Sequence, residues 1–161
     1  MDVAPGPGVD VVADFLDVSP GSLPFDNDVF DEMLAINVLD QLRDPTALMS
    51  ELYRIARPGC QLVVQLPYGS SDEAWVDPGS VRPYFLDSFG CFGQPYYWFR
   101  DQGYTGDWQL AFVIVKMSRE RFADVTYTER LRAIHETRNA VKEMTAILMA
   151  MKPPRPQDRN L

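Results

Sequence analysis

Residues that build many catalytic sites are scarce in this sequence. Among 161 residues there is one histidine, His135, and there are two cysteines, Cys60 and Cys91. A single imidazole excludes a multi-histidine zinc site and argues against Ser-His-Asp or Cys-His catalysis. The cysteines stand in no metal-binding or redox spacing, so we expect no bound metal and a reducing, cytoplasmic environment. The cluster Asp26–Asp28 lacks the turn glycine and distal glutamate of a calcium loop, and we interpret it as a turn.

Long apolar runs and basic residues are scarce as well. No run approaches the roughly 18 apolar residues that a membrane span needs, and no charged-then-apolar leader is present, so we expect a soluble intracellular protein. With 15 Lys and Arg against 23 Asp and Glu, the formal charge is −8. Nucleic-acid-binding proteins usually present a basic face, so nucleic acid is not the expected partner. Residues 119–161 carry a net charge of +3 against −11 for residues 1–118, and we interpret this basic segment as a solvated helix face.

The apolar content is sufficient for one globular core. Apolar residues make up 46% of the chain and aromatic residues 12%, which is typical of a folded domain and not of a disordered segment. We therefore expect a single domain over residues 1–161. Its sheet and crossover helix would lie in residues 1–117, and a helix with a proline-rich tail would occupy residues 118–161.

A strand-helix-strand pattern occupies the centre of the chain. After a first short strand at residues 9–15, residues 29–38 form an apolar run of strand length. Asp44 and Pro45 are typical of a helix start, and apolar residues then recur at helical spacing. Residues 61–66 form a buried strand beyond the helix. This order predicts two parallel strands joined by a crossover helix, and hence an α/β sheet.

The last third of the sequence predicts two more strands and a helix. Residues 96–99 and 108–117 are rich in aromatic and β-branched residues and would form a hairpin. Thr126 and Glu129 have the spacing of a capping box, which predicts a long amphipathic helix over residues 129–151. Prolines beyond residue 152 would end that helix.

Several short motifs follow one another in a fixed order. They are Asp14-Phe15, Leu23-Pro24-Phe25-Asp26-Asn27-Asp28-Val29-Phe30-Asp31, Val38-Leu39-Asp40-Gln41, Asp44-Pro45, and Glu51-Leu52-Tyr53-Arg54-Ile55-Ala56-Arg57-Pro58-Gly59-Cys60. The order resembles the class I S-adenosylmethionine-dependent methyltransferases of the methyltransferase type 11 kind. Their middle reads roughly D-A, L-P-F-x-D-x-S-F-D, V-L-E-H, D-P and E-x-x-R-V-L-K-P-G-G. The resemblance covers residues 1 to about 117.

The resemblance implies the fold and a set of cofactor-binding residues. The fold would be an incomplete Rossmann-like sheet of about five strands, mostly parallel with an antiparallel carboxyl-terminal hairpin, followed by the long helix. Asp2 matches the acidic residue that holds the ribose hydroxyls, and Asp14 with Phe15 matches the pair that receives the adenine. Asn37, at the carboxyl end of a strand, would face the methyl group. For Asp14, a turn residue at a strand end is an equally good interpretation.

The catalytic residues are less well defined by the resemblance. In a subgroup of the family, a D-P-T-H-V-R segment follows the strand after P-G-G, and Asp77–Arg82 matches it except that Gly79 and Ser80 replace the threonine and the histidine. Asn37, Tyr68, Asp77 and Arg82 are therefore candidates without an assigned role. V-L-E-H has become Val-Leu-Asp-Gln, so both histidines that could carry a proton are absent. Methyl transfer depends mainly on alignment, so this loss weakens an enzymatic interpretation without excluding it.

The glycine-rich loop D-x-G-x-G-x-G of these proteins is not recognisable. Only 15 residues separate Gly8 from Leu23, where the family needs about 40 for one helix and two strands. We therefore expect the first strand, its loop and the first helix to be absent. The cofactor site would be incomplete in one chain, and strand 29–38 would have an unpaired edge. A second copy or a complementary subunit is expected to pair with that edge.

Three interpretations follow from these observations. The first is an S-adenosylmethionine-dependent methyltransferase whose substrate is selected by residues 68–92 and whose cofactor site is completed by another chain. The second is a non-catalytic pseudo-methyltransferase that acts as an assembly or binding module. The third, a nucleic-acid accessory factor that uses the basic tail, conflicts with the overall negative charge. The methyl acceptor cannot be identified from family motifs alone.

Overall fold

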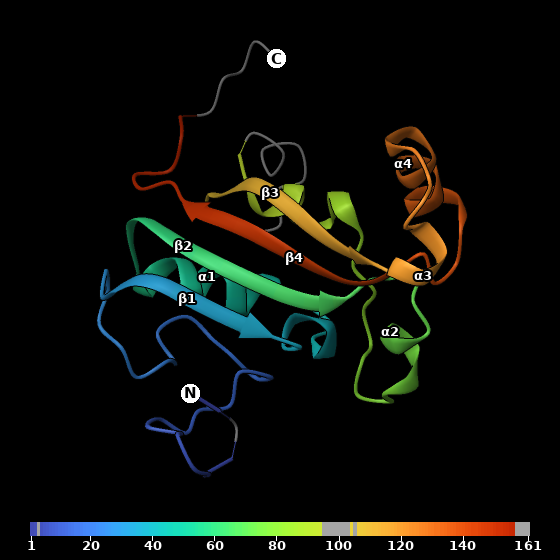
Figure 1. Ribbon diagram of the computed structural model, residues 1–161. Helices are drawn as coiled ribbons and strands as arrows, with labels where there is room; N and C mark the ends of the chain where they lie inside the picture. Colours follow the sequence, from blue (N-terminus) through green and yellow to red (C-terminus); the bar gives the residue numbers. More distant parts are fainter. Residues whose placement is uncertain (3, 95–103, 105, 157–161) are drawn as a thin grey trace.

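The computed structural model describes residues 1–2, 4–94, 104 and 106–156, and its centre is one mixed β-sheet with helices around it (Figure 1). In chain order the elements are β1 (Phe30–Ile36), the 3-10 helix η1 (Leu39–Gln41), α1 (Thr46–Ile55), β2 (Ala56–Pro67), α2 (Glu73–Val76), the 3-10 helix η2 (Leu86–Phe92), β3 (Trp108–Met117), α3 (Arg119–Phe122), α4 (Tyr127–Glu136) and β4 (Val141–Ala150).

The predicted strand-helix-strand unit is confirmed. β1 and β2 are parallel neighbours, and α1 connects them. The Asp44 carboxylate accepts a hydrogen bond from the backbone N–H of Thr46 at 2.9 Å, which satisfies one of the amides that a helix start leaves without a partner. Leu48, Leu52 and Ile55 are buried on one side of α1, as their spacing predicts.

The expected long carboxyl-terminal helix is wrong. The capping box of Thr126 and Glu129 is present, but α4 ends at Glu136. Asn139 then adopts a left-handed backbone conformation with φ of 59°, and residues 141–150 form β4. β4 lies between β2 and β3 and is antiparallel to both. In this place it supplies backbone partners to two strands at once, which no helix could do.

The sheet also differs from the expected composition. Its order is β1-β2-β4-β3, so the described sheet has four strands, with one parallel and two antiparallel pairs, and is not mostly parallel. The strand expected at residues 9–15 is reduced to one isolated parallel bridge between Asp2 and Val12. The residues before this segment are rich in Pro and Gly, and no described strand lies beside it to form a hydrogen-bonded ladder. The strand expected at residues 96–99 lies outside the described residues.

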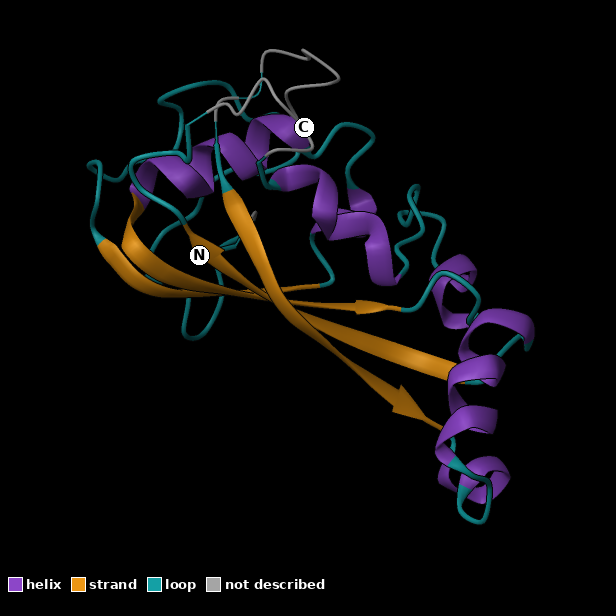
Figure 2. Ribbon diagram, turned by 90° about the horizontal axis from the view of Figure 1, so that it is seen from above, coloured by secondary structure: helices purple, strands orange, loops and turns teal. Residues whose placement is uncertain are grey.

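Among the described residues, the helices lie on one face of the sheet or beyond its end (Figure 2). The covered face carries the core, including Leu62, Leu66 and Leu148, each with no accessible surface. The indole N–H of Trp108 on β3 donates to the carbonyl of Met49 on α1 at 3.1 Å. This hydrogen bond attaches α1 to β3, the strand at the opposite edge of the sheet from β1.

The chain beyond β4 folds back over α1. The Lys152 ammonium donates to the carbonyls of Arg54 at 3.1 Å and Ala56 at 2.6 Å, at the carboxyl end of α1. A cation there satisfies carbonyls that the helix leaves without partners. The Tyr53 hydroxyl donates to the carbonyl of Met151, and burial, with the nearby Asp107 and Asp28 charges, raises the pKa of Tyr53 to about 12.

Within the described part of the chain, no helix is long and apolar enough to cross a membrane.

Neighbouring side chains on β4 test its assignment as a strand. We expect Leu148→Ala to lower the free energy of unfolding by about 2–5 kcal/mol, because it leaves a cavity in the covered face. Met149→Ala, on the half-buried opposite face, should cost less than about 1.5 kcal/mol. Urea unfolding of both variants measures the difference. Equal losses of unfolding free energy in the two variants would contradict the alternation of buried and half-buried side chains along β4.

Candidate functional site

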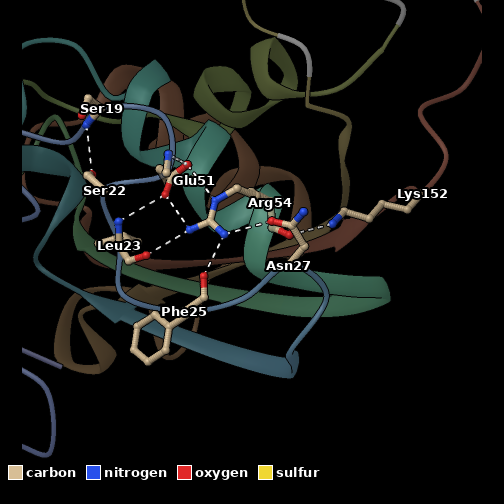
Figure 3. A network of polar contacts seen from close by, with 9 residues as sticks. Ser19, Ser22, Leu23, Phe25, Asn27, Glu51, Arg54 and Lys152 are labelled. Carbon is tan, nitrogen blue, oxygen red and sulfur yellow. Dashed lines mark hydrogen bonds and ion pairs between the residues drawn. The ribbon is translucent and has the colours of Figure 1, made fainter.

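An ion pair on α1, formed by a buried carboxylate and a partly exposed guanidinium, holds the segment that leads into β1 (Figure 3). The Glu51 side chain is 2% exposed and pairs with Arg54 through two hydrogen bonds of 3.0 and 2.9 Å. Glu51 also accepts the backbone N–H groups of Gly21 and Leu23. Arg54 donates to the carbonyls of Leu23 and Phe25. The pair therefore joins the Leu-Pro-Phe motif to the helix.

The electrostatics of this pair follow from its burial and its partners. Burial alone would raise the pKa of the Glu51 carboxyl, but the hydrogen bonds from Arg54, Gly21 and Leu23 outweigh it and hold that pKa below its ordinary value. The hydrogen bond to Glu51 raises the pKa of Arg54. Glu51 is therefore ionised at neutral pH, with its charge fully compensated.

A second polar connection joins two motifs that are 40 residues apart in the chain. The carbonyl of Asp40 in η1 accepts the backbone N–H groups of Val81 at 2.8 Å and Arg82 at 3.0 Å. Its carboxylate Oδ2 accepts the Ser80 hydroxyl at 2.7 Å. Nearby, the Tyr84 hydroxyl donates to the carbonyl of Leu39 at 3.2 Å, and burial raises the pKa of Tyr84. Asp40 thus anchors the loop of residues 77–82 beside the end of β1.

A cavity of about 330 Å³ lies between the amino-terminal segment and the start of α1. The amino-terminal side contributes residues 15–18, and the other side contributes residues 41–44 with Ala47 and Leu48. Phe15, Leu42 and Leu48 give it apolar walls, Gln41 adds an amide, and Asp17, Arg43 and Asp44 add charged groups. The Gln41 amide donates to the carbonyl of Asn37 at 2.8 Å, which connects this wall to the end of β1.

The structure brings only part of the predicted cofactor set to this cavity. Phe15 lines it, whereas Asp2, Asp14 and Asn37 do not. The Asp14 carboxylate accepts the N–H of Leu16 at 2.8 Å, which is the geometry of a turn residue. Asp2 makes a similar turn with Ala4 and pairs through its backbone with the segment around Val12.

Asn37 directly follows β1 and has a left-handed backbone conformation with φ of 51°. Its backbone N–H donates to the carbonyl of Gln65 at 2.9 Å, so it continues the pairing with β2, while the residue is exposed. Asparagine tolerates this conformation better than most residues. Asn37 therefore lies at the carboxyl edge of the parallel strands, as its sequence position predicts.

The other three candidates for catalytic residues have different surroundings. Tyr68 is 3% exposed and its ring contacts Phe85 edge-on at 5.5 Å, and burial raises its pKa. Asp77 is exposed and its carboxylate accepts the N–H of Gly79 at 2.7 Å, as in a turn. Arg82 is exposed, with its guanidinium 6.0 Å from the Tyr84 ring centroid.

A second cavity, of about 270 Å³, lies at the carboxyl end of β2, where β3 ends and β4 begins. Its walls include Ser71, Arg121 and Lys142. Asn139, also on the wall, accepts the N–H of Asp72 at 2.7 Å through its side chain. This cavity therefore opens beside the start of the segment expected to select a substrate.

Residues 3–64 match the family model described as "Methyltransferase domain". The match covers less than half of the chain, and it makes these residues similar to a methyltransferase domain. Proteins of this family use S-adenosylmethionine. The matched segment contains β1, α1 and the first part of β2, together with the Glu51–Arg54 pair and every residue that lines the first cavity. No curated protein sequence matches the chain.

Solved structures of methyltransferases share the fold. A protein from Haloferax volcanii, solved in complex with the Trm112 methyltransferase activator, superposes with a TM-score of 0.51 at 18% identity and covers 88% of this chain. A SAM-dependent methyltransferase from Archaeoglobus fulgidus gives 0.51 at 14% identity over 78% of this chain. One from Mesorhizobium loti gives 0.51 at 11% identity over 89% of this chain and 71% of its own. The chain covers 61% of the first two proteins, which is less than two thirds of their length.

The first cavity fits one end of S-adenosylmethionine. Its volume lies at the lower limit of the roughly 300–1,000 Å³ that small-molecule sites occupy. The apolar walls of Phe15, Leu42 and Leu48 suit a flat aromatic ring. Because Asp2 and Asn37 do not line it, the residues present fit the adenine of the cofactor and neither its ribose nor its methyl end.

Sequence reasoning assigned no role to Asp40, Glu51 or Arg54. A signal for Glu51 was available, because it falls on the same helical stripe as Leu48, Leu52 and Ile55, where a carboxylate needs a buried partner. For Asp40 no comparable signal exists, since its partners at residues 80–82 are distant in the chain.

Removing the Glu51 charge should destabilise the protein in a pH-dependent manner. We expect Glu51→Gln to lower the free energy of unfolding by about 3–5 kcal/mol at pH 7, because Arg54 loses its charged partner. The folded pKa of Glu51 is depressed, so its contribution is present above the unfolded value of about 4.3 and is lost as the pH falls through the folded pKa.

The measurement is urea unfolding of the wild type and the variant between pH 3 and 8, and the two curves should converge at the acidic end. Glu136→Gln is the matched control, because Glu136 pairs with Arg132 on the surface and should cost less than about 1 kcal/mol. A pH-independent difference for Glu51→Gln would contradict the assigned electrostatics.

The Asp40 connection can be tested separately from overall stability. We expect Asp40→Ala to increase hydrogen exchange of the Val81 and Arg82 amides by at least about tenfold relative to amides in β2, because the loop loses its anchor to Ser80. Asp77→Ala, which removes only the turn contact to Gly79, should leave the Val81 and Arg82 amides protected. Unchanged exchange in Asp40→Ala would show that the carboxylate does not hold the loop.

Proposed function

We propose that this protein is an S-adenosylmethionine-dependent methyltransferase-like protein whose cofactor site is completed by a partner chain. The observation that carries the proposal is the cavity between Phe15 and the start of α1, within the segment that matches the methyltransferase domain. Following the family's arrangement, the adenine would lie against Phe15, with Asp14 turning its carboxylate toward the exocyclic amine. Asp2 would hold the ribose, and Asn37 would face the methyl group.

The acceptor side of the proposed site lies at the carboxyl ends of β1 and β2. Asn37 follows β1 and Tyr68 follows β2, and ligands of α/β proteins bind at such strand ends. The loop of residues 77–82 is anchored to Asp40, beside the end of β1, which supports a role for Asp77 and Arg82 near the acceptor. The methyl group is the group transferred, and alignment of the acceptor is the main requirement on the protein.

A partner chain would complete the site along β1. β1 is an edge strand of the sheet, and an unpaired edge is a surface that proteins usually cover or pair. A second copy or a complementary subunit could add its strand there. The Haloferax volcanii protein of the same fold is found in complex with a methyltransferase activator.

The alternative is a non-catalytic pseudo-methyltransferase that serves as an assembly module. The specific observation in its favour is that Tyr68 is buried and the Asp77 carboxylate is engaged in a turn, so neither offers a free proton-transfer group in this conformation. In this case the sheet would be retained for its surfaces and not for chemistry.

Calorimetric titration with S-adenosylmethionine distinguishes the two proposals. We expect the purified chain to bind the cofactor with a dissociation constant of tens of micromolar, corresponding to about 6 kcal/mol, because only the adenine end is held. Ala47→Trp, which fills the cavity, should weaken binding at least tenfold. Ala123→Trp, at an exposed position outside this cavity, is the control of equal size change and should bind normally.

Absence of binding at millimolar cofactor, in a sample whose fold is verified by circular dichroism, would reject the cofactor site in the isolated chain and favour the pseudoenzyme. Equal affinity of Ala47→Trp and the wild type would place the cofactor elsewhere.

A further inference from the structure

The second cavity, of about 270 Å³, is a concave site to which the proposed function gives no role. It lies at the carboxyl end of β2, where α2 and α3 extend beyond the sheet (Figure 1). Three segments form its walls: residues 71–73 after β2, Ser118 and Arg121 after β3, and Asn139 and Lys142 where β4 begins. Ligands of α/β proteins bind at such strand ends, so the chemistry of these walls indicates what the cavity holds.

Backbone hydrogen bonds fix the three walls relative to one another. The N–H of Asn139 donates to the carbonyl of Ser70 at 3.1 Å, which ties the start of β4 to the turn after β2. The N–H of Ser118 donates to the carbonyl of Ala140 at 3.4 Å, which ties the end of β3 to the same place. The cavity is therefore formed before a ligand arrives, and binding does not have to order its walls.

The acidic side chains of the walls are engaged by internal partners. Asp72 Oδ1 accepts the Nε–H of Arg138 at 2.8 Å, and Oδ2 accepts the side-chain amide of Asn139 at 2.8 Å. These hydrogen bonds, with that from Asn139 the stronger influence, hold the pKa of the Asp72 carboxyl below its ordinary value. Glu73 Oε2 accepts the Ser71 hydroxyl at 3.2 Å. The walls therefore offer no pair of free carboxylates to a cation.

The basic side chains of the walls keep donors available. The Arg121 guanidinium lies 5.5 Å from the Phe122 ring centroid and has no carboxylate partner among the described residues. The Lys142 ammonium lies 3.9 Å from Glu73 Oε1, which is too long for a hydrogen bond, so its N–H groups are not committed to that carboxylate. The Ser118 hydroxyl adds a neutral donor to the same walls. The cavity therefore presents a guanidinium, an ammonium and a hydroxyl together.

The charge of the cavity is opposite to the charge of the whole chain. Arg138 balances the charge of Asp72. Lys142 balances Glu73, so Arg121 leaves one positive charge in excess. The chain as a whole has a formal charge of −8, so an anion is repelled by most of the surface and attracted to this cavity. Carboxylate and phosphate oxygens are the acceptors that guanidinium and ammonium groups bind most strongly.

We propose that the second cavity binds an anionic group, a carboxylate or a phosphate, of the methyl acceptor. The acceptor role rests on the proposed function, whereas the binding of an anion does not. Arg121 would donate two parallel hydrogen bonds to the anion, Lys142 would act as a point charge, and Ser118 would supply a further donor. The volume lies below the roughly 300–1,000 Å³ of sites that hold a whole ligand, so the cavity takes this group and not the entire acceptor.

The position of the cavity defines the length of such an acceptor. The N–H of Tyr68, directly after β2, donates to the carbonyl of Lys142 at 3.0 Å, so the cavity wall adjoins this strand end. The N–H of Asn37 donates to the carbonyl of Gln65, three residues before Tyr68. Three residues of a strand rise about 10 Å. An acceptor whose anionic group lies in the cavity would therefore place its methylated atom about 10 Å away, near Asn37, which is within the length of one small molecule.

NMR titration of the nitrogen-15-labelled full chain with inorganic phosphate, and separately with acetate, tests the proposal at constant ionic strength. We expect saturable shifts of the backbone amides of residues 118–121 and 139–142, with a dissociation constant of about 1 mM for at least one of the two anions. Saturation by phosphate alone would identify the bound group as a phosphate, and saturation by acetate alone would identify it as a carboxylate.

Substitutions of the basic residues locate the bound anion. Arg121→Gln and Lys142→Gln each remove a charged donor and should raise the dissociation constant at least fivefold. Arg132→Gln is the matched control, because Arg132 pairs with Glu136 on α4 outside the cavity, and it should bind like the wild type. Equal affinity of Arg121→Gln and Arg132→Gln, or no saturation of the wild type by either anion at about 20 mM, would overturn the proposal. The amide spectrum of each variant verifies its fold.

Titration with S-adenosylmethionine at saturating phosphate separates the anion site from the proposed function. Phosphate should leave the affinity for the cofactor unchanged, because the first and second cavities share no residue. Competition between the two would place the phosphate in the cofactor site and overturn the proposal. Cofactor binding without anion binding would reject the second cavity alone. Anion binding without cofactor binding would reject the proposed function, and with it the acceptor role of the cavity.

Discussion

The Glu51–Arg54 ion pair is the constraint on which the arrangement around the proposed site depends. It connects α1 to the backbone of residues 21–25, which leads directly into β1. Residues 15–18, which precede this segment, line the first cavity together with the start of α1. A buried pair of this kind contributes little net stability compared with apolar packing, but it fixes one geometry, because each donor and acceptor has one set of partners.

Elements whose patterns are local could be predicted from the sequence. β1, α1 and β2 were predicted because a helix start, a helical stripe and two apolar runs follow one another over fewer than 40 residues. β4 was mistaken for a helix because its run of Met, Ala and Leu residues suits both structures. Its conformation is decided by the backbone N–H and C=O groups of β2 and β3, which need hydrogen-bond partners on either side of it. The sequence of residues 141–150 alone does not reveal these neighbours.

The candidate site was predictable to a similar extent. The motif order pointed to Phe15, which lines the first cavity, and to Asn37, which lies outside it at the end of β1. The sequence could not indicate that Asp40 would anchor residues 80–82, or that Tyr68 would be buried against Phe85. These contacts arise when distant loops pack on the end of the sheet, and each loop carries too few residues to reveal its partner.

The interior position of β4 has a consequence for synthesis. The strand that joins β2 to β3 is the last one to leave the ribosome, so the sheet cannot close while residues 141–150 remain inside the exit tunnel. Until then β3 has no neighbour within the sheet and β2 has only β1. A nascent chain halted before residue 141 would therefore present two open ladders to chaperones and proteases.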